Sequence, residues 1–266
     1  MKRLIFIFLL CLFLAGCQEN ESILHTEPES NMHVSVSNLS DKKAGWGFRK
    51  IKGARPEFTK EQIKTMEDFS CMYLGEEGSK SVYLTFDEGY ENGYTEKILD
   101  VLRKHSVPAA FFITGDYFDK NGDLVCKMVE DGHIVGNHTE NHPSLPEKGA
   151  EEIEREITVL NDKFFEKFGF NMKYLRPPMG EYSEKSLAIT KNMGYTNVFW
   201  SFAYKDWETD VQKGKEHALS EVKKCLHDGA VILLHAVSSD NAAAMEDIIL
   251  YVREMGFEFK SLDEYR

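Results

Sequence analysis

From residue 81 onward, the 266-residue chain alternates short apolar segments with segments whose apolar residues recur every three or four positions. The first pattern predicts buried strands and the second predicts amphipathic helices. The predicted strands are 82–86, 109–114, 133–136, 173–176, 196–200, 230–234 and 257–259, and the predicted helices are 95–105, 124–129, 151–168, 183–193, 215–226 and 241–254. This alternation requires parallel strands, which defines an α/β fold.

Two parallel architectures fit this order of strands and helices: an open doubly wound sheet and a closed barrel. Polar residues of unusual kinds lie at or just after the ends of five of the predicted strands; they are Asp87 with Glu88, His138 with His142, Arg176, Asp206 and His235. An open sheet binds its ligand at the few strand ends beside the switch point, whereas a barrel brings all carboxyl ends to one mouth. Five contributing strands, in a set of seven rather than eight, therefore predict an incomplete (β/α)7 barrel.

The N-terminus has the pattern of an export signal. Two basic residues precede an apolar run of eleven residues at 4–14, which is shorter than the ~20 residues that span a bilayer. The run ends in Leu14-Ala15-Gly16-Cys17, which resembles the lipobox of bacterial lipoproteins, where the signal is cut before an acylated cysteine. We therefore expect a signal peptide at 1–16 and a lipid anchor on Cys17, which holds the protein on the extracytoplasmic side of a bacterial cell membrane. An ordinary secretory signal with a chance cysteine is the alternative.

Composition divides the rest of the chain and limits its partners. Residues 17–44 are polar and rich in Ser and Asn, which predicts a flexible tether. We expect 45–80, with one helix over 59–69, to be an N-terminal extension of a catalytic domain at 81–266. The chain has 32 Lys and Arg against 44 Asp and Glu, a net charge of −12, so no nucleic acid partner is expected. The three cysteines beyond Cys17 form no CxxC pair, which indicates neither a disulfide framework nor a thiolate metal site.

The polar residues at the strand ends suggest a metal site with a base beside it. Asp87 and Glu88 end an apolar strand and point in different directions, so one carboxylate can bind a metal while the other stays free. His138 and His142 are spaced HxxxH and can meet one cation, but Thr139 stands where the HExxH motif has its Glu. Two histidines and a carboxylate suit zinc with one position open for water. Each pair considered alone also has a structural explanation. The two carboxylates can form a solvated turn, and the two histidines can lie in the core.

Five motifs resemble, in order, those of the polysaccharide deacetylases, which form carbohydrate esterase family 4 and share the NodB-homology domain. The first is Thr85-Phe86-Asp87-Glu88-Gly89-Tyr90, which is similar to the TFDDG motif of that family. The others are Asn137-His138-Thr139 with His142-Pro143-Ser144, Arg176-Pro177-Pro178-Met179-Gly180, the segment 200–207, and Leu233-Leu234-His235. The stretches 90–94, 197–201 and 238–242 more closely resemble the muramic-acid branch, the delta-lactam-biosynthetic de-N-acetylases that prepare spore-cortex peptidoglycan.

The resemblance implies a catalytic role for four residues. Asp87 matches the general base and His235 matches the general acid. Arg176 matches the residue that holds the base, and Asp206 is expected to orient His235.

The resemblance also implies a cofactor and a substrate surface. The cofactor is a divalent metal, zinc before cobalt or another cation, and the implied ligands are Glu88, His138 and His142. Glu88 departs from the family, which has Asp at this position in most members. The expected substrate-binding residues are Tyr90, Met179, Tyr182 and Trp200, with a backbone N–H near 179–182 for the oxyanion.

We therefore expect a metal-dependent hydrolase that removes acetyl groups from N-acetylmuramic acid in peptidoglycan, on the way to the muramic δ-lactam of spore cortex. Muramic acid carries a lactyl ether at O3, and Arg176 or Lys205 is the predicted partner for its carboxylate. The alternative substrate is N-acetylglucosamine in peptidoglycan or in chitin oligomers. A retaining glycosidase, with carboxylates about 5 Å apart, leaves the HxxxH pair and His235 without a role. A non-catalytic glycan-binding lipoprotein needs no base, acid and ligand set.

Overall fold

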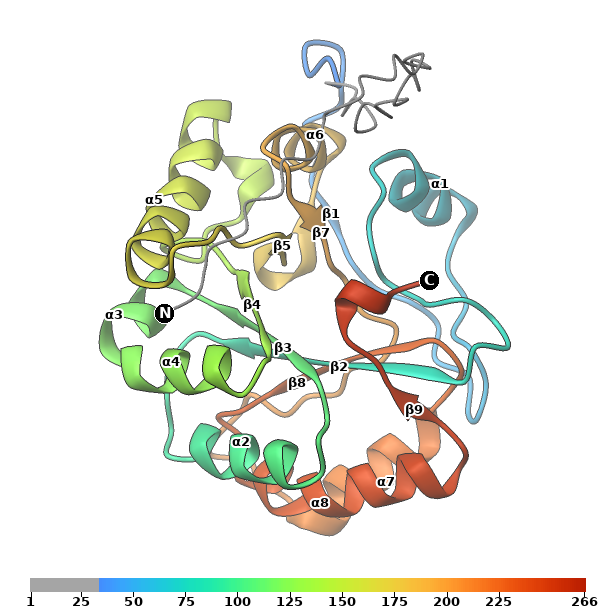
Figure 1. Ribbon diagram of the computed structural model, residues 1–266. Coiled ribbons are helices and arrows are strands. Elements are labelled where there is room, and N and C mark those ends of the chain that lie inside the picture. Colours follow the sequence, from blue (N-terminus) through green and yellow to red (C-terminus); the bar gives the residue numbers. More distant parts are fainter. Residues whose placement is uncertain (1–33) are drawn as a thin grey trace, which may run out of the picture. The chain divides into compact units, whose positions relative to one another are not determined.

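Seven parallel strands form the main sheet of the computed structural model, which describes residues 34–266 (Figure 1). In sheet order they are β7 (Thr196–Asn197), β5 (Tyr174–Leu175), β4 (Ile134–Asn137), β3 (Ala109–Ile113), β2 (Ser81–Glu88) and β8 (Ala230–His235), and β9 (Glu258–Phe259) also pairs with β2. Every pairing in this sheet is parallel. The predicted α/β class with a parallel, barrel-like sheet is confirmed.

Helices cover the outer side of this sheet. Figure 1 shows α2 (Thr95–Lys104), α4 (Gly122–Glu130), α5 (Ala150–Phe168), α7 (Lys215–Cys225) and α8 (Ser239–Glu254) around it. Their apolar residues and the outward-facing side chains of the strands form one core cluster. These five helices and α6 (Glu184–Asn192) match the six predicted ones. The sequence pattern missed α3 (Gly115–Lys120), because six residues are too few to show helical periodicity.

An irregular segment, 198–202, leads the chain from the β5 side of the sheet to its other edge. Beyond β7, Phe202 forms a parallel bridge with Ile232 of β8. The Ser201 N–H donates to the Val231 carbonyl at 3.0 Å, and the Leu233 N–H donates to the Phe202 carbonyl at 2.9 Å. The chain thus leaves β5 early to reach β8, which explains why the predicted strand 196–200 is only two residues long.

Strand β2 separates two layers of the core. Leu84 and Phe86 belong to the cluster between sheet and helices, whereas Tyr83 belongs to the cluster inside the half-barrel. Side chains alternate along a strand, so Asp87 shares the inner side with Tyr83, and Glu88 shares the outer side with Phe86. All eight residues of β2 are buried.

Residues 34–44 lie against the domain, which corrects the predicted tether at this end. The Val34 backbone exchanges two hydrogen bonds, each 2.8 Å long, with the Asn192 side chain. Strand β1 (Ala44–Gly45) pairs antiparallel with β6 (Glu181–Tyr182). The apolar residues of this segment are spaced too irregularly for a sequence pattern to show these contacts.

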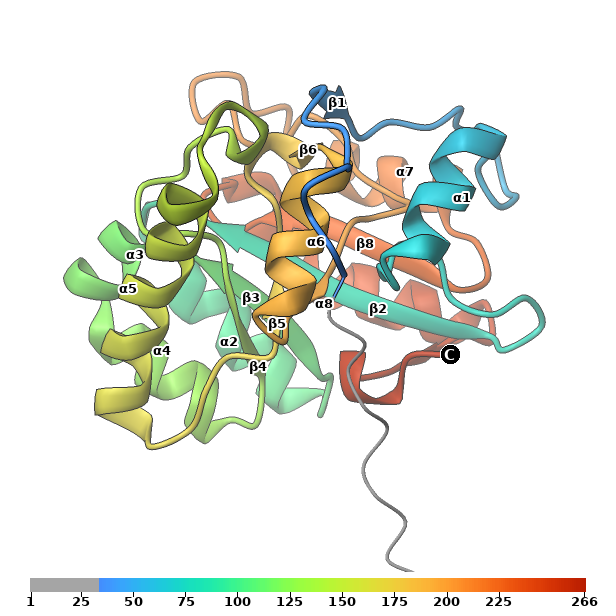
Figure 2. The ribbon, with the colours of Figure 1, turned by 90° about the horizontal axis from the view of Figure 1, so that it is seen from above.

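The N-terminal extension contains the predicted helix. Helix α1 (Lys60–Asp68), labelled in Figure 2, begins with a capping box formed by Thr59 and Gln62. Its Met66 belongs to the same core cluster as Leu187 and Ala188 of α6. The predicted signal peptide 1–16, the lipidation site Cys17 and the tether up to residue 33 lie outside the described residues. Within residues 34–266, no helix combines the length and the apolar character needed to cross a bilayer.

Candidate active site

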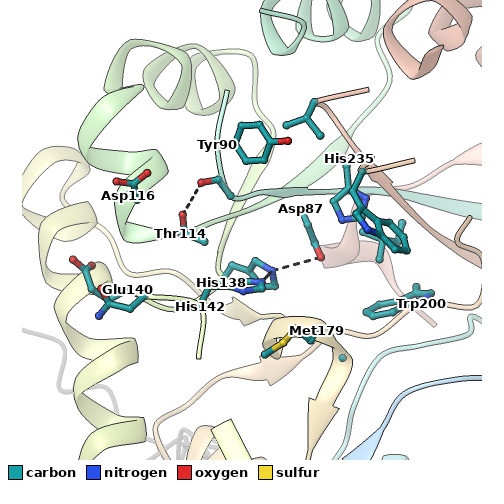
Figure 3. A pocket seen from close by; sticks show the side chains of 16 residues that line it. Asp87, Tyr90, Thr114, Asp116, His138, Glu140, His142, Met179, Trp200 and His235 are labelled. Carbon is teal, nitrogen blue, oxygen red and sulfur yellow. Dashed lines mark hydrogen bonds and ion pairs between the residues drawn. The ribbon is translucent and has the colours of Figure 1, made fainter. Parts of the chain in front are cut away.

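A cavity of 750 Å³ opens at the carboxyl ends of the strands (Figure 3). The sequence-predicted residues that line it are Asp87, Tyr90, His138, His142, Met179, Trp200 and His235. Arg176 contacts Asp87 from behind the cavity wall, and Asp206 contacts His235 in the same way. Two predicted site residues, Glu88 and Tyr182, do not line the cavity.

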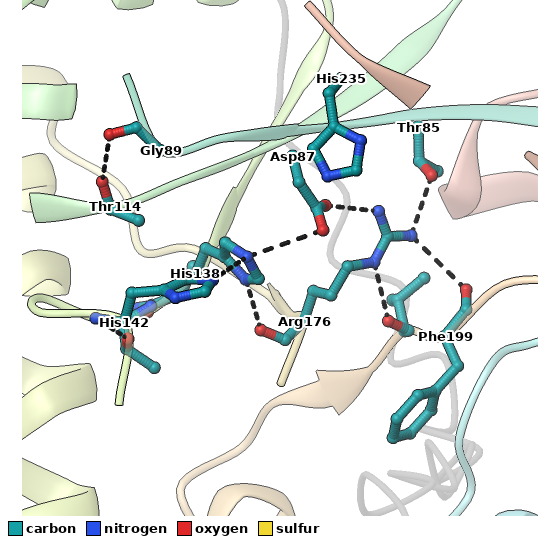
Figure 4. A network of polar contacts seen from close by, with 12 residues as sticks. Thr85, Asp87, Gly89, Thr114, His138, His142, Arg176, Phe199 and His235 are labelled. Carbon is teal, nitrogen blue, oxygen red and sulfur yellow. Dashed lines mark hydrogen bonds and ion pairs between the residues drawn. The ribbon is translucent and has the colours of Figure 1, made fainter. Parts of the chain in front are cut away.

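Asp87 and Arg176 form a buried ion pair in the cavity wall (Figure 4). The Arg176 guanidinium donates to Asp87 Oδ1 at 2.7 Å, to the Thr85 hydroxyl at 2.9 Å and to the Val198 carbonyl at 3.1 Å. It also lies over the Phe112 ring, 4.2 Å from the centroid, and is fully buried. Arg176 is therefore placed to hold the Asp87 carboxylate in one orientation.

The charge of Arg176 also keeps Asp87 ionised. Burial raises the pKa of Asp87, but the charge of Arg176, with those of His138 and His235 in their protonated forms, outweighs burial and holds the pKa below its ordinary value. The second carboxylate oxygen, Oδ2, lies 3.6 Å from His138 Nε2 at the cavity. A carboxylate with one oxygen held and the other beside the cavity can accept a proton from water.

His138 and His142 meet across an irregular turn, not along a helix. Their Nε2 atoms are 3.1 Å apart. Thr139 and His142 have positive φ angles of 69° and 56°, which are uncommon for residues with side chains. Glu156 of α5 holds this turn, because its carboxylate accepts hydrogen bonds from the Asn141 backbone at 2.8 Å and side chain at 2.9 Å. The strained backbone is thus fixed by its surroundings, as is common at functional sites.

Both histidines of the turn are neutral at pH 7. His138 Nδ1 lies 2.7 Å from the Arg176 carbonyl oxygen, which only accepts, so Nδ1 carries the proton and Nε2 keeps its lone pair. Burial lowers the pKa of His138 to about 4, although the Asp87 charge opposes this shift. Burial also lowers the pKa of His142. Neutral imidazole is the form that binds a metal.

Glu88 does not join the two histidines, contrary to the predicted ligand set. Its side chain is fully buried, and neither carboxyl oxygen has a hydrogen-bond partner among the residues that the structure describes. The alternation along β2 explains this position, because it places Glu88 on the helix side of the sheet when Asp87 faces the interior. Burial, together with the charges of Glu91 and Asp87, raises the pKa of Glu88 well above its ordinary value, which favours the neutral acid.

The donor set therefore fits a divalent cation only in part. Two neutral imidazoles whose Nε2 atoms are 3.1 Å apart suit a first-row metal. However, no three His, Cys, Asp or Glu side chains within residues 34–266 form a group that could hold a metal ion. The predicted three-ligand site is not completed by Glu88.

His235 and Asp206 form a second pair, and Figure 3 shows His235 on the other side of Asp87 from His138. His235 Nδ1 lies 2.7 Å from Asp206 Oδ1, and the His235 backbone N–H donates to Asp206 Oδ2 at 2.8 Å. Burial lowers the pKa of His235, but the hydrogen bond and charge of Asp206 outweigh burial and raise it. A raised pKa keeps His235 protonated near neutral pH, as a general acid requires.

Three of the four predicted substrate-binding residues lie at the cavity. Tyr90 and Met179 are 50% and 54% exposed and stand at its rim, and Trp200 forms part of its wall. Gly180 has a φ of 66°, and a Cβ there would lie 2.8 Å from the Trp200 ring. Glycine at this position thus lets the turn after β5 approach Trp200 closely.

The fourth predicted substrate-binding residue, Tyr182, is a correction. It is buried in a core cluster, where its ring packs edge-on against Phe199 with centroids 5.4 Å apart. The prediction followed the motif that ends at Gly180, but β6 turns the Tyr182 side chain into the core. Trp207, in contrast, was missed: it lines the cavity and packs edge-on against His235 at 5.5 Å. Its position directly after Asp206 was a usable signal.

Sequence reasoning also missed polar residues that follow β3 and β4. The cavity residues of this kind are Thr114, Asp116, Glu140 and Asn141. Single polar residues after a strand form no motif, although the last two lie inside the HxxxH stretch. Within the described part of the chain, residues 34–266, no Lys or Arg lines the cavity.

The two cations predicted to bind a lactyl carboxylate are therefore placed elsewhere. Arg176 is fully buried and engaged with Asp87. Lys205 pairs with Glu208 and does not line the cavity.

An ionised carboxylate and a protonated imidazole that face one cavity are the parts of a hydrolase with a general base and a general acid. Residues 75–198 match the family described as Polysaccharide deacetylase. The chain is 43% identical over 221 residues to the peptidoglycan-N-acetylmuramic acid deacetylase PdaA of Bacillus subtilis, covering 82% of this chain and 84% of that protein. The structure of PdaA, a family 4 carbohydrate esterase, matches with a TM-score of 0.83 at 42% identity, covering 85% of this chain and 98% of the chain in that structure.

Two further relatives mark the range of the family. A chitooligosaccharide deacetylase of Sinorhizobium fredii is 32% identical and covers 70% of this chain and 92% of its own length. A family 4 pseudoenzyme of Bacillus anthracis matches with a TM-score of 0.68 at 25% identity, covering 73% of this chain and 67% of its own.

The chain belongs to the polysaccharide deacetylase family. It is a hydrolase that acts on carbon–nitrogen bonds, and members of the family are generally metal-dependent.

Proposed function

We propose that this protein hydrolyses the acetamide of N-acetylmuramic acid in peptidoglycan, outside the cytoplasmic membrane. The observation that carries this proposal is geometric: Asp87, which Arg176 holds at 2.7 Å, and His235, which Asp206 holds at 2.7 Å, face one cavity. The identity of 43% to a muramic acid deacetylase, over most of both chains, supports the choice of sugar.

The proposed general base, Asp87, activates the attacking water. An acetamide is a poor electrophile, so the attacking water needs to lose a proton as it attacks. Asp87 is the proton acceptor, because Arg176 holds one of its oxygens at 2.7 Å and leaves the other beside the cavity. General base assistance of this kind contributes typically about 10²–10⁴-fold to the rate.

The acid side releases the amine. The nitrogen of an amide leaves only after it is protonated, and His235 supplies this proton from the ring edge that faces the cavity. Asp206 holds Nδ1, so the proton to be given lies on Nε2. A backbone N–H of the turn at Met179 and Gly180, which both line the cavity, is the proposed donor to the oxyanion.

His138 and His142 are the proposed protein ligands of a divalent cation, and zinc is the expected ion. Their neutral rings and the 3.1 Å between their Nε2 atoms support a divalent first-row metal. Imidazole suits cobalt and other such cations as well as zinc, so these ligands alone do not select the ion. Metal analysis of the purified protein identifies the ion.

The cavity favours sugar recognition through neutral groups. Tyr90 and Trp207 are about half exposed at its rim and offer a hydroxyl, an indole N–H and aromatic faces. Since no Lys or Arg of the described residues 34–266 lines the cavity, the lactyl carboxylate of a peptide-free muramoyl residue is bound without a Lys or Arg partner from the cavity wall. We therefore expect the KM for such a substrate to depend weakly on salt.

The test is product analysis by mass spectrometry on peptide-free peptidoglycan, peptide-bearing peptidoglycan and chitin oligomers. We expect loss of acetyl groups from muramoyl residues stripped of peptide, less or none from peptide-bearing ones, and little from chitin. Efficient deacetylation of chitin oligomers alone would instead indicate a chitooligosaccharide deacetylase, like the Sinorhizobium relative. No acetate from any glycan would favour a non-catalytic binding protein.

The proposal also includes the membrane attachment of the protein and the reaction that follows deacetylation. We propose that Cys17 carries a lipid anchor, which Cys17→Ser tests by release from the membrane fraction. We also propose that the freed amine closes onto the lactyl carboxyl to give the muramic δ-lactam of spore cortex. Mass spectrometry detects this closure as the loss of one further water from the deacetylated product.

A further inference from the structure

The segment that carries Asp206 has no regular structure of its own. Residues 203–214 form no helix or strand. Asp206 is nevertheless buried, and its two oxygens contact His235 at 2.7 and 2.8 Å. A side chain on irregular backbone needs other contacts to hold it in a catalytic geometry.

We propose that Asn241, in the first turn of α8, is a positioning residue that fixes Asp206 against His235, and that Tyr204 fixes Asn241 in turn. This inference rests on the proposed function, because the role of His235 as general acid belongs to it.

The contacts of the Asn241 amide point to this role. Its Nδ2 donates to Asp206 Oδ2 at 2.6 Å and to the His235 carbonyl at 3.2 Å. Its Oδ1 accepts a hydrogen bond from the Tyr204 hydroxyl. Asn241 is fully buried and Tyr204 is buried, so these hydrogen bonds do not compete with water. One amide thus contacts both members of the acid pair.

The first turn of α8 is itself anchored to the irregular segment. The Asn241 N–H donates to the Ser238 hydroxyl at 3.2 Å, which caps the helix. Gln212 Oε1 accepts from the Ser238 hydroxyl at 2.8 Å and from the Asp240 N–H at 3.2 Å. Asp240 Oδ2 accepts from the Gly214 N–H at 2.9 Å. Asn241 therefore stands on a rigid helix end that holds the segment at two places.

Loss of these contacts has a defined electrostatic consequence. The charged and titratable groups that act on His235 are Asp206, Asp87, Arg176 and His142. Among them, Asp206 supplies the hydrogen bond that opposes burial. When Asp206 is free to move, burial dominates and the pKa of His235 falls. The protonated acid is then lost at lower pH.

Three variants test the chain of contacts. Asn241→Ala removes all three contacts without adding a charge, and Asn241→Leu removes them while keeping most of the side-chain volume. Tyr204→Phe removes only the hydroxyl. We expect kcat to fall about 10- to 100-fold in the Asn241 variants and less in Tyr204→Phe, with KM little changed. We also expect the alkaline limb of the kcat profile to move to lower pH in all three variants.

Asn197→Leu is the matched control. Asn197 is another fully buried asparagine, bonded to Thr190 and not to the acid pair. Its loss is expected to lower stability without moving the pH profile. This control separates positioning from a general effect on folding.

Titration of the His235 ring by NMR gives a readout that needs no substrate. We expect a lower His235 pKa in Asn241→Ala and Tyr204→Phe than in the wild type. Wild-type kcat and an unmoved His235 pKa in both folded variants would overturn the inference, even if Asn241→Leu fails to fold. A wild-type protein without deacetylase activity would overturn the proposed function instead, while the NMR comparison still tests the positioning.

Discussion

Asp87 and Glu88 are neighbours on β2, and their side chains lie on opposite sides of the sheet. Asp87 belongs to the inner side, where Arg176 donates to it at 2.7 Å and the cavity begins. Glu88 belongs to the helix side, where neither of its oxygens has a hydrogen-bond partner within residues 34–266. Both carboxyl groups are buried, with 9% and 0% of the residue exposed.

The two groups differ in protonation although their burial is nearly the same. The pKa of Asp87 lies below its ordinary value and that of Glu88 lies well above it. Burial raises both, so the cation Arg176 makes the difference. A buried carboxyl group therefore becomes a base only where the fold supplies an opposite charge, and the inner side of β2 is that place.

The largest expected effect is the loss of the base. Asp87→Asn keeps shape and a hydrogen bond to Arg176 but accepts no proton, so kcat is expected to fall about 10²–10⁴-fold. Acetate release measures it. Glu88→Gln, one residue away, is the matched control and is expected to keep wild-type turnover. An equal loss in Glu88→Gln would show that the outer carboxyl also takes part in the reaction.

The next effect concerns Arg176, whose charge makes the pKa of Asp87 differ from that of Glu88. Arg176→Gln leaves Asp87 without its counter-charge, and removal of one partner of a buried ion pair costs about 3–5 kcal/mol of unfolding free energy. Since Arg176 lowers the pKa of Asp87, its loss raises that pKa. The acidic limb of the activity profile therefore moves to higher pH.

Urea unfolding and a pH–rate profile check both parts of this prediction. The double variant with Asp87→Asn is expected to be less destabilised than the sum of the single variants, because the unpaired charge is removed. Additive losses would contradict the pairing.

Some parts of this molecule can be predicted from local patterns in its sequence. The parallel fold followed from the alternation of apolar strands and amphipathic helices, and the convergence of Asp87, His138 and His235 followed from their positions after strands. These are local patterns with a fixed geometric consequence. The alternation of side chains along β2 also predicts that Glu88 lies on the helix side. The motif resemblance instead places Glu88 among the metal ligands, and the structure agrees with the alternation.

Other features depend on contacts between distant segments and left no local signal. The Asn241 amide reaches Asp206, 35 positions away, only after α8 packs against the segment 203–214. Tyr182 follows a cavity motif but is turned into the core by its pairing with Ala44 in β1. Neither a period nor a motif records such contacts.

A smaller effect is expected from replacing the unpartnered acid. Glu88→Met removes a buried carboxyl without hydrogen bonds and is expected to raise the unfolding free energy by about 1–3 kcal/mol at pH 7. The folded-state pKa of Glu88 lies above its ordinary value of 4.5, so the folded protein holds a proton that the unfolded chain has released. Wild-type stability therefore falls as the pH rises above 4.5.

Urea unfolding of both proteins between pH 4 and pH 8 checks this prediction. The advantage of Glu88→Met should grow with pH through this window and level off below it. A wild type that gains stability relative to the variant as the pH rises would mean that Glu88 is ionised and paired.

The smallest expected effect is that of Glu88→Gln on the metal content of the protein. This variant tests the position of Glu88 directly. If the two histidines bind the cation and Glu88 stays on the helix side, Glu88→Gln should retain as much metal after dialysis as the wild type. His138→Ala should lose it, because it removes one of two Nε2 atoms that lie 3.1 Å apart. Elemental analysis of the three proteins, with unfolding curves to show that each is folded, makes the comparison. Loss of metal in Glu88→Gln to the level of His138→Ala would show that the Glu88 carboxyl turns into the cavity when the cation binds, and the contrast between the two sides of β2 would then hold only for the metal-free protein.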